Sequence, residues 1–146
     1  FPILTKAPPK ATTIPILSYT QNGFFLMIEG SNIDKAAHSN NLEEMMEELL
    51  DFDRTAGAVL DWASKHPGTL VVITADHNTG AFALTGGSRE QGEITGRFGS
   101  GSHDGVAVPV YAFGAGSGDF TGIYENTDIF NKIMNALKKG ADKPVR

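Results

Sequence analysis

Histidine and aspartate residues occur together at three places in this sequence, with spacings that can hold a metal ion. Asp34 and His38 are four residues apart, so one turn of helix would put both on the same face. Asp76 and His77 are adjacent and follow an apolar run, so they must lie in a turn if both are to reach one site. His103 lies in a Gly-rich stretch just before another apolar run. Imidazole nitrogens and carboxylate oxygens are ligands that zinc takes in proteins.

Each of these groups also has a simpler interpretation. An Asp-x-x-x-His pair on a helix is usually exposed without a ligand, Asp76 can cap the next element, and a histidine in a Gly-rich loop is usually solvated. Glu29 is harder to explain in this way, because a carboxylate that ends a strand of Phe, Leu, Met and Ile needs a partner. His66 precedes Pro-Gly at the end of a predicted helix and is interpreted as a surface residue.

The composition limits the function classes. The 146 residues are 40% hydrophobic, which is enough for one domain with its own core. The formal net charge is −5 and there is no basic stripe, so a nucleic-acid partner is not indicated. No apolar run reaches the length of about 18 residues that a membrane-spanning helix needs. Because cysteine is absent, any metal must be held by His, Asp and Glu.

The apolar pattern predicts an α/β fold, a mostly parallel sheet flanked by helices. Residues 24–29, 70–74 and 106–113 are short apolar runs, which is typical of strands buried on both faces. The first two runs are separated by a predicted helix, an order that favours a right-handed crossover. Pro109 indicates that the third run is an edge strand or contains a bulge.

Two helices and two irregular segments complete the prediction. Residues 41–65 carry apolar residues at helical spacing, and Pro67-Gly68 ends the pattern. A final helix should begin at Asn126 or Thr127 and run through Lys139. Residues 78–105 are Gly-rich, and an excursion of that length inside a compact domain is usually functional. Residues 1–20 contain four prolines and are predicted to be an irregular lead-in segment.

The predicted strands bring most of the polar groups to one edge of the sheet. In open α/β sheets, sites form at the carboxyl ends of the strands. Glu29 and the Asp76-His77 pair satisfy this rule. His103 instead precedes its strand, so the Gly-rich excursion would have to return it to the same edge. The prediction of one site therefore depends on His103 lying close to Asp34 and His38.

Taken together, the three groups resemble the alkaline phosphatases. The segments that carry the resemblance are GFFLMIEGSNIDKAAH (23–38), TLVVITADHNTG (69–80) and SHDGVAVPVYAFG (102–114), in the order and approximate spacing of that family. The resemblance covers about residues 21–139. It implies that residues 21–146 are the C-terminal part of an alkaline phosphatase-like catalytic domain, and so a partial domain.

The resemblance also implies the role of each polar residue. The centre would hold two zinc ions and one magnesium ion. The implied ligands are Glu29 for magnesium, Asp34, His38 and His103 for the first zinc, and Asp76 and His77 for the second zinc. Lys35 would reach the phosphate of the substrate through water.

The reaction implied by the resemblance is the hydrolysis of small-molecule phosphate monoesters through a phosphoserine intermediate. The Asp-Ser-Ala motif of the nucleophile does not occur in these 146 residues. We therefore expect no catalytic nucleophile in this chain, a serine upstream in the N-terminal part of the same enzyme, and no activity of the chain alone. By resemblance, the intact protein would be a homodimer in the periplasm or outside the cell. A phosphodiesterase of the same superfamily and a non-catalytic metal-binding fragment are the alternatives.

Overall fold

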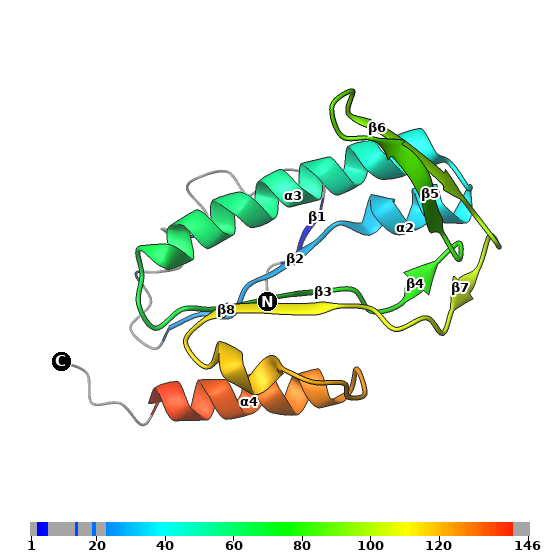
Figure 1. Ribbon diagram of the computed structural model, residues 1–146. Helices are drawn as coiled ribbons and strands as arrows, with labels where there is room; N and C mark the ends of the chain where they lie inside the picture. The colour runs from blue at the N-terminus through cyan, green and yellow to red at the C-terminus, as the bar shows by residue number, and fades with distance from the viewer. Residues whose placement is uncertain (1–2, 6–13, 15–18, 20–22, 142–146) are drawn as a thin grey trace.

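The computed structural model describes residues 3–5, 14, 19 and 23–141. Helix α3 lies along one side of the β3–β8 ribbon and α4 lies along the other (Figure 1). The elements in chain order are β1 (Ile3–Thr5), β2 (Met27–Glu29), α2 (Ser31–His38), α3 (Leu42–Ser64), β3 (Leu70–Thr74), β4 (Asn78–Thr79), β5 (Ala83–Ser88), β6 (Glu93–Arg97), β7 (His103–Asp104), β8 (Val110–Gly114), the 3-10 turn η1 (Ser117–Phe120) and α4 (Asp128–Ala141).

The strand pairings do not confirm a mostly parallel sheet. Among the described strands, β1 and β2 pair in parallel, whereas β3–β8, β4–β7 and β5–β6 are antiparallel. Strand β3 pairs with β8 in a register that puts Thr74 opposite Val110, so the predicted crossover partner β2 is not its neighbour. The chain leaves β3 at Thr74, makes its excursion and enters β8 from the same end. A strand that starts where its neighbour ends must run antiparallel to it.

Two of the predicted strands are shorter or more exposed than the apolar pattern indicates. Strand β8 begins at Val110 and not at residue 106, because Pro109 has no N–H to donate to a ladder. Strand β2 covers only Met27–Glu29, and the Met27 side chain is 50% exposed. The prediction that this strand is buried on both faces is therefore wrong within the part of the chain that the structure describes.

Both predicted helices are present close to their predicted bounds. Helix α3 begins at Leu42, and the Asn41 side chain caps it by accepting a hydrogen bond of 3.2 Å from the Glu44 N–H. Helix α4 begins at Asp128. Within the segment 1–20, which was expected to be irregular, Ile3–Thr5 forms strand β1 against β2.

The packed core that concerns the site lies beneath α2. Ala36 and Ala37 on α2 are buried against Met45 of α3. The partly buried side chains around them come from α2, from the start of α3 and from the two ends of the β5–β6 hairpin: Ile33, Leu42, Phe82 and Phe98. Small residues on this face let α2 approach α3 closely, and this packing fixes the opposite, polar face of α2.

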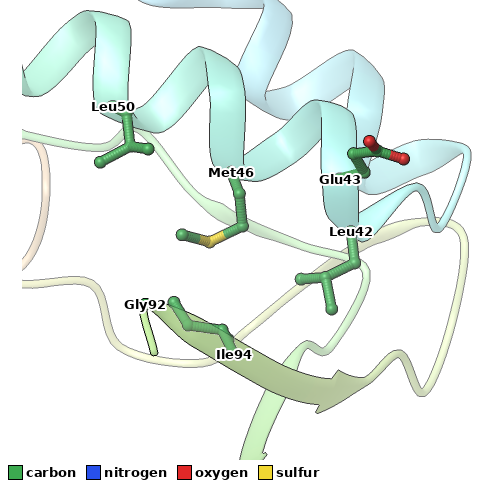
Figure 2. Close-up of a pocket in the computed structure, with 6 residues that line it drawn as sticks. All are labelled: Leu42, Glu43, Met46, Leu50, Gly92 and Ile94. Carbon is green, nitrogen blue, oxygen red and sulfur yellow. The ribbon is translucent and has the colours of Figure 1, made fainter. Parts of the chain in front are cut away.

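An apolar groove lies between α3 and the β5–β6 hairpin. Figure 2 shows Leu42, Met46 and Leu50 pointing from α3 toward Gly92 and Ile94 of the hairpin region. Glu43 also lines the groove, and no residue of the histidine clusters does. None of the described helices is both long enough and apolar enough to cross a bilayer.

Gly80 joins the core to the loops that carry the polar groups. Its φ is +80°, a conformation that L side chains rarely adopt. Its N–H donates to the Ser102 carbonyl at 2.9 Å, and its carbonyl accepts from the Gly99 and Ser100 N–H groups at 3.0 and 3.1 Å. A Cβ at this position would lie 2.9 Å from Phe98 Cδ1 and 3.1 Å from the Ala37 carbonyl oxygen.

Gly80→Ala should destabilise the intact enzyme more than Gly92→Ala does. Gly92 also has a positive φ, +68°, but a Cβ there would meet nothing within 4 Å. The control therefore incurs only the backbone cost of roughly 1–2 kcal/mol, whereas Gly80→Ala also displaces Phe98. The measurement is the shift in the urea unfolding midpoint for each variant. Equal shifts would show that the contacts around Gly80 are not tight.

Candidate metal centre

Helix α2 presents Asp34 and His38 on one face, as their spacing predicts. The His38 Nε2 atom lies 3.4 Å from Asp34 Oδ2. The other face of the helix carries Ala36 and Ala37 in the core, so these two polar side chains face the loops that follow β3. Asp34 is half-buried, which limits the water that can solvate its carboxylate.

The short β4–β7 ladder brings the other two histidines together. Thr79 pairs with His103, and Asn78 pairs with Asp104. Side chains of directly paired residues lie on the same face of a ladder, and alternate residues along a strand return to that face. His77 is two residues before Thr79, and its ring stacks on the His103 ring with centroids 3.6 Å apart.

His103 lies beside the Asp34–His38 turn, as a single site requires. Its Nε2 atom is 3.0 Å from His38 Nε2 and 3.5 Å from Asp34 Oδ1. Ligand atoms from Asp34, His77 and His103 all lie within 4.8 Å of one another. The long excursion therefore does return His103 to the edge at which β3 ends.

These separations suit a tetrahedral zinc ion. Ligands about 2.0–2.1 Å from a tetrahedral zinc lie about 3.3 Å from one another. The Nε2 atoms of His38 and His103 are 3.0 Å apart, and they lie 3.4 Å from Oδ2 and 3.5 Å from Oδ1 of Asp34, respectively. A donor set of two imidazole nitrogens and one carboxylate is also of the type that zinc prefers.

A backbone carbonyl fixes which nitrogen of His38 can bind a cation. His38 Nδ1 lies 2.7 Å from the Gly101 carbonyl oxygen. Because a carbonyl can only accept, Nδ1 carries the proton and donates it. In the neutral ring the lone pair is then on Nε2, the atom that faces His103 and Asp34. Such a hydrogen bond from the second nitrogen is common among metal-binding histidines.

The hydroxyl group of Thr79 lowers the pKa of the Asp34 carboxyl. Thr79 Oγ1 donates to Asp34 Oδ1 over 2.6 Å, and this hydrogen bond is the largest cause of the shift. Partial burial opposes it by raising the pKa, and the positive charge that His38, His103 and His77 can carry lowers it further. Asp34 is therefore ionised at neutral pH, as a metal ligand must be.

Asp104 holds the β4–β7 ladder from its other face. Its carboxylate accepts from Asn78 Nδ2 at 2.9 and 3.1 Å, and from the Ala81 and Val106 N–H groups at 3.0 Å each. The Val106 N–H, followed by Asn78, keeps the pKa of Asp104 below its ordinary value. Asp104 thus connects β4 and the turn that follows it to the segment that leads into β8.

The remaining predicted site residues have few or no contacts with the cluster. Asp76 Oδ2 is 3.2 Å from His77 Nε2, and the Asp76 side chain is 86% exposed. Glu29 ends β2 and is exposed, and no polar contact between its carboxylate and the cluster occurs among the described residues. Lys35 is exposed and its Nζ donates to Asn32 Oδ1 at 3.3 Å. The contacts therefore join Asp34, His38, His77 and His103 directly, and Asp76 through His77.

Sequence reasoning did not identify Thr79 or Asp104 as part of the site. Period-two alternation from His77 would have put Thr79 on the same face, provided that a strand follows the turn. Strand β4 has only two residues, which is too short for an alternating pattern to be recognised in the sequence. The role of Asp104 was not predicted, because two of its three partners, Asn78 and the Ala81 N–H, reach it only when the excursion folds.

Comparisons with known proteins show which family this chain resembles. The model of the alkaline phosphatase family matches residues 5–98. The alkaline phosphatase of Escherichia coli is 31% identical over 152 residues, which cover 93% of this chain and 32% of that protein. Alkaline phosphatase 3 of Bacillus subtilis is 47% identical over 73 residues, 50% of this chain and 16% of that protein.

Solved structures match over most of the chain. The alkaline phosphatase of the Antarctic bacterium TAB5 aligns with a TM-score of 0.80 and 41% identity, covering 88% of this chain and 39% of that one. A mutant of the same enzyme, solved with Mg bound in its M3 site, aligns with a TM-score of 0.79 and 42% identity. The chain spans well under half the length of these relatives. With a family match across residues 5–98 and this shared fold, the chain belongs to the alkaline phosphatase family.

Proposed function

We propose that the intact protein carrying this chain hydrolyses phosphate monoesters at a centre of two zinc ions and one magnesium ion. The observation that carries the proposal is the meeting of Asp34, His38 and His103, from two segments far apart in sequence, with their nitrogen and oxygen atoms 3.0–3.5 Å apart. Family membership supplies the reaction class, phosphoric monoester hydrolysis.

In this proposal the chain supplies one ligand set for each zinc ion. Asp34, His38 and His103 would hold the first, and Asp76 and His77 would hold the second. Bound zinc would stabilise the negative charge that develops on the phosphoryl oxygens. The residues of the chain orient the ligands: the Gly101 carbonyl turns Nε2 of His38 toward the cluster, and the Thr79 hydroxyl holds one oxygen of Asp34.

The second ligand pair needs a proton or a cation between its members. Thr79 Oγ1 is 3.2 Å from His77 Nδ1 and already donates its proton to Asp34, so Nδ1 must be the donor in that contact. In a neutral His77 ring, Nε2 is then unprotonated, yet it lies 3.2 Å from an oxygen of the Asp76 carboxylate. Two acceptors at this separation repel each other unless a proton or a metal cation lies between them.

Glu29 and Lys35 have roles that depend on groups outside this chain. A magnesium site takes mostly oxygen ligands and needs several of them. Glu29 would provide one of these ligands, and the rest would come from upstream segments and from water. Lys35 follows Asp34 on α2, and its exposed ammonium group, which donates to Asn32, would reach a phosphate through water.

We further propose that the nucleophile is a serine in the N-terminal part of the same enzyme, acting through a phosphoserine intermediate. The exposed apolar side chains support such a missing part. Tyr111 and Phe113 on β8 are 64% and 44% exposed, and Phe130 on α4 is 67% exposed. No large side chain in the described chain is less than 2% exposed. Such surface is typical of a domain from which a packing partner has been removed.

The family resemblance extends the proposal to assembly and location. Alkaline phosphatases are usually homodimers and are usually exported, so we propose a homodimer in the periplasm or outside the cell. Its substrates would be small phosphate monoesters. A phosphodiesterase or a non-catalytic metal-binding protein would be distinguished by the substrate that the intact protein turns over.

His38→Ala and His103→Ala should each remove one zinc ion from the intact enzyme, because each deletes a ligand of the first set. His66→Ala is the matched control. His66 stacks on Trp62 with ring centroids 3.9 Å apart, and its Nδ1 lies 2.7 Å from the Trp62 carbonyl oxygen. Zinc content after dialysis against a weak chelator measures the effect. A control variant that loses as much zinc as the other two contradicts the assignment.

Anomalous scattering at the zinc edge gives the matching test on the unaltered enzyme. Two peaks are expected in zinc-replete crystals, one beside Asp34, His38 and His103 and one beside Asp76 and His77. A single peak, or none, would rule out the two-zinc centre.

Lys35→Ala should raise the KM for p-nitrophenyl phosphate and weaken inhibition by free phosphate, each by roughly two- to fivefold. This is the size expected for an exposed ionic contact worth about 0.5–1 kcal/mol. Lys65→Ala, at the C-terminal end of α3, serves as the control because it removes the same charge outside the proposed site. Unchanged KM and phosphate inhibition in the Lys35 variant would remove Lys35 from the proposed site.

The isolated 146-residue chain should not turn over p-nitrophenyl phosphate, with or without added zinc and magnesium. It contains metal ligands but no nucleophile motif. The assay compares the chain with the intact enzyme at equal concentration, and circular dichroism checks that the chain has formed helix. Robust zinc-dependent turnover by the folded chain would refute the upstream nucleophile.

A further inference from the structure

Thr79 contacts side chains from both proposed zinc sets. It lies in β4 directly opposite His103 and is 9% exposed. Its hydroxyl oxygen is 2.6 Å from Asp34 Oδ1, in the first set, and 3.2 Å from His77 Nδ1, in the second. Because little of Thr79 is open to water, its hydroxyl takes these protein groups as partners.

The protons around this hydroxyl can be counted. A hydroxyl has one proton to donate, and an ionised carboxylate can only accept. The short distance of 2.6 Å to Asp34 matches an O–H group donating to a charged oxygen. The hydroxyl oxygen is then left to accept, and among the described residues the group placed to donate to it is His77, through Nδ1–H. The tautomer with Nδ1 protonated leaves the lone pair of His77 on Nε2.

We propose that Thr79 is a positioning residue that prepares both zinc sets through a single hydroxyl, by holding Oδ1 of Asp34 and by selecting Nε2 of His77 as the ligating atom. This inference rests on the proposed metal centre. It explains why one threonine is buried between an aspartate of α2 and a histidine of the turn after β3. It also makes the two sets interdependent, since loss of the hydroxyl releases a ligand in each.

The geometry on the far side of His77 agrees with this assignment. Its Nε2 atom faces Asp76 Oδ2 at 3.2 Å, so the nitrogen selected by Thr79 is the one that points toward the other proposed ligand of the second zinc. The Gly101 carbonyl makes the same selection for His38. The Gly101 carbonyl and the Thr79 hydroxyl each accept a hydrogen bond from Nδ1. In both neutral rings the unprotonated nitrogen is therefore Nε2.

Thr79→Val in the intact enzyme tests the proposal. Valine keeps the shape of threonine but replaces the hydroxyl with a methyl group. We expect zinc affinity to fall by roughly 10–100-fold at both sites, the usual effect of losing a group that orients a metal ligand. Thr79→Ser keeps the hydroxyl and should bind zinc within about threefold of the unaltered enzyme. Thr85→Val, an exposed threonine of β5, should leave zinc affinity unchanged.

Zinc affinity is measured by competition with a chelator on metal-free protein, and circular dichroism verifies that each variant folds. Loss at both sites in the valine variant, with recovery in the serine variant, is the expected result. Unchanged affinity in the valine variant would overturn the inference. So would an equal loss in the serine variant, because the hydroxyl would then not be the group that matters.

A second measurement needs no variant. Nitrogen-15 NMR of the histidine rings in the unaltered, metal-free enzyme reports which nitrogen of His77 carries the proton. Protonation at Nδ1 is expected, and a neutral ring protonated at Nε2 would contradict the role of Thr79. The two failures are distinguishable: an unaltered enzyme that binds no zinc refutes the proposed centre, whereas one that binds two zinc ions regardless of Thr79 refutes this inference alone.

Discussion

The candidate centre depends on two paired residues, Thr79 in β4 and His103 in β7. Their register puts both side chains on one face of the ladder, next to His77. A shift of one residue would turn His103 to the opposite face, because side chains alternate along a strand. A ladder of two residues cannot hold its register alone. Asp104 holds it from the other face, by accepting hydrogen bonds from Asn78 and from two backbone N–H groups.

The antiparallel return of the chain explains how His103 reaches the other ligands. The sequence pattern predicted the strands and the polar groups at their ends, and it also predicted a mostly parallel sheet. That sheet would have left His103, which precedes its strand, at the wrong edge. In the structure β8 runs antiparallel to β3, so the start of β8 lies beside the end of β3. The unconfirmed parallel sheet and the difficulty with His103 therefore have one cause, the antiparallel pairing of β3 with β8.

The parts of the fold that could be predicted are those specified locally. Helix α3 is specified by its long apolar stripe and by its cap at Asn41. The contact between Asp34 and His38 requires only one helical turn. The parts that could not be predicted depend on distant groups. Nothing near Thr79 in the sequence indicates that its hydroxyl will meet Asp34, 45 residues earlier. The exposure of Met27 could not be predicted for a similar reason. An apolar run indicates a strand, but it does not indicate which segment will pack on each face of that strand.

The site is open on the side where the proposal requires more protein. Asp76 is 86% exposed and the His103 side chain is 51% exposed, although electrostatic contacts act strongly only where water is excluded. Asp34 is less exposed at 39%, and α2, β4 and β7 surround it. The first ligand set is thus shaped largely by this chain, through core packing, the Gly101 carbonyl and the Thr79 hydroxyl. In the proposed second set, Asp76 contacts only its neighbour His77 within the part of the chain that the structure describes. A segment that covers Asp76 would complete the second set and would also exclude water from the first.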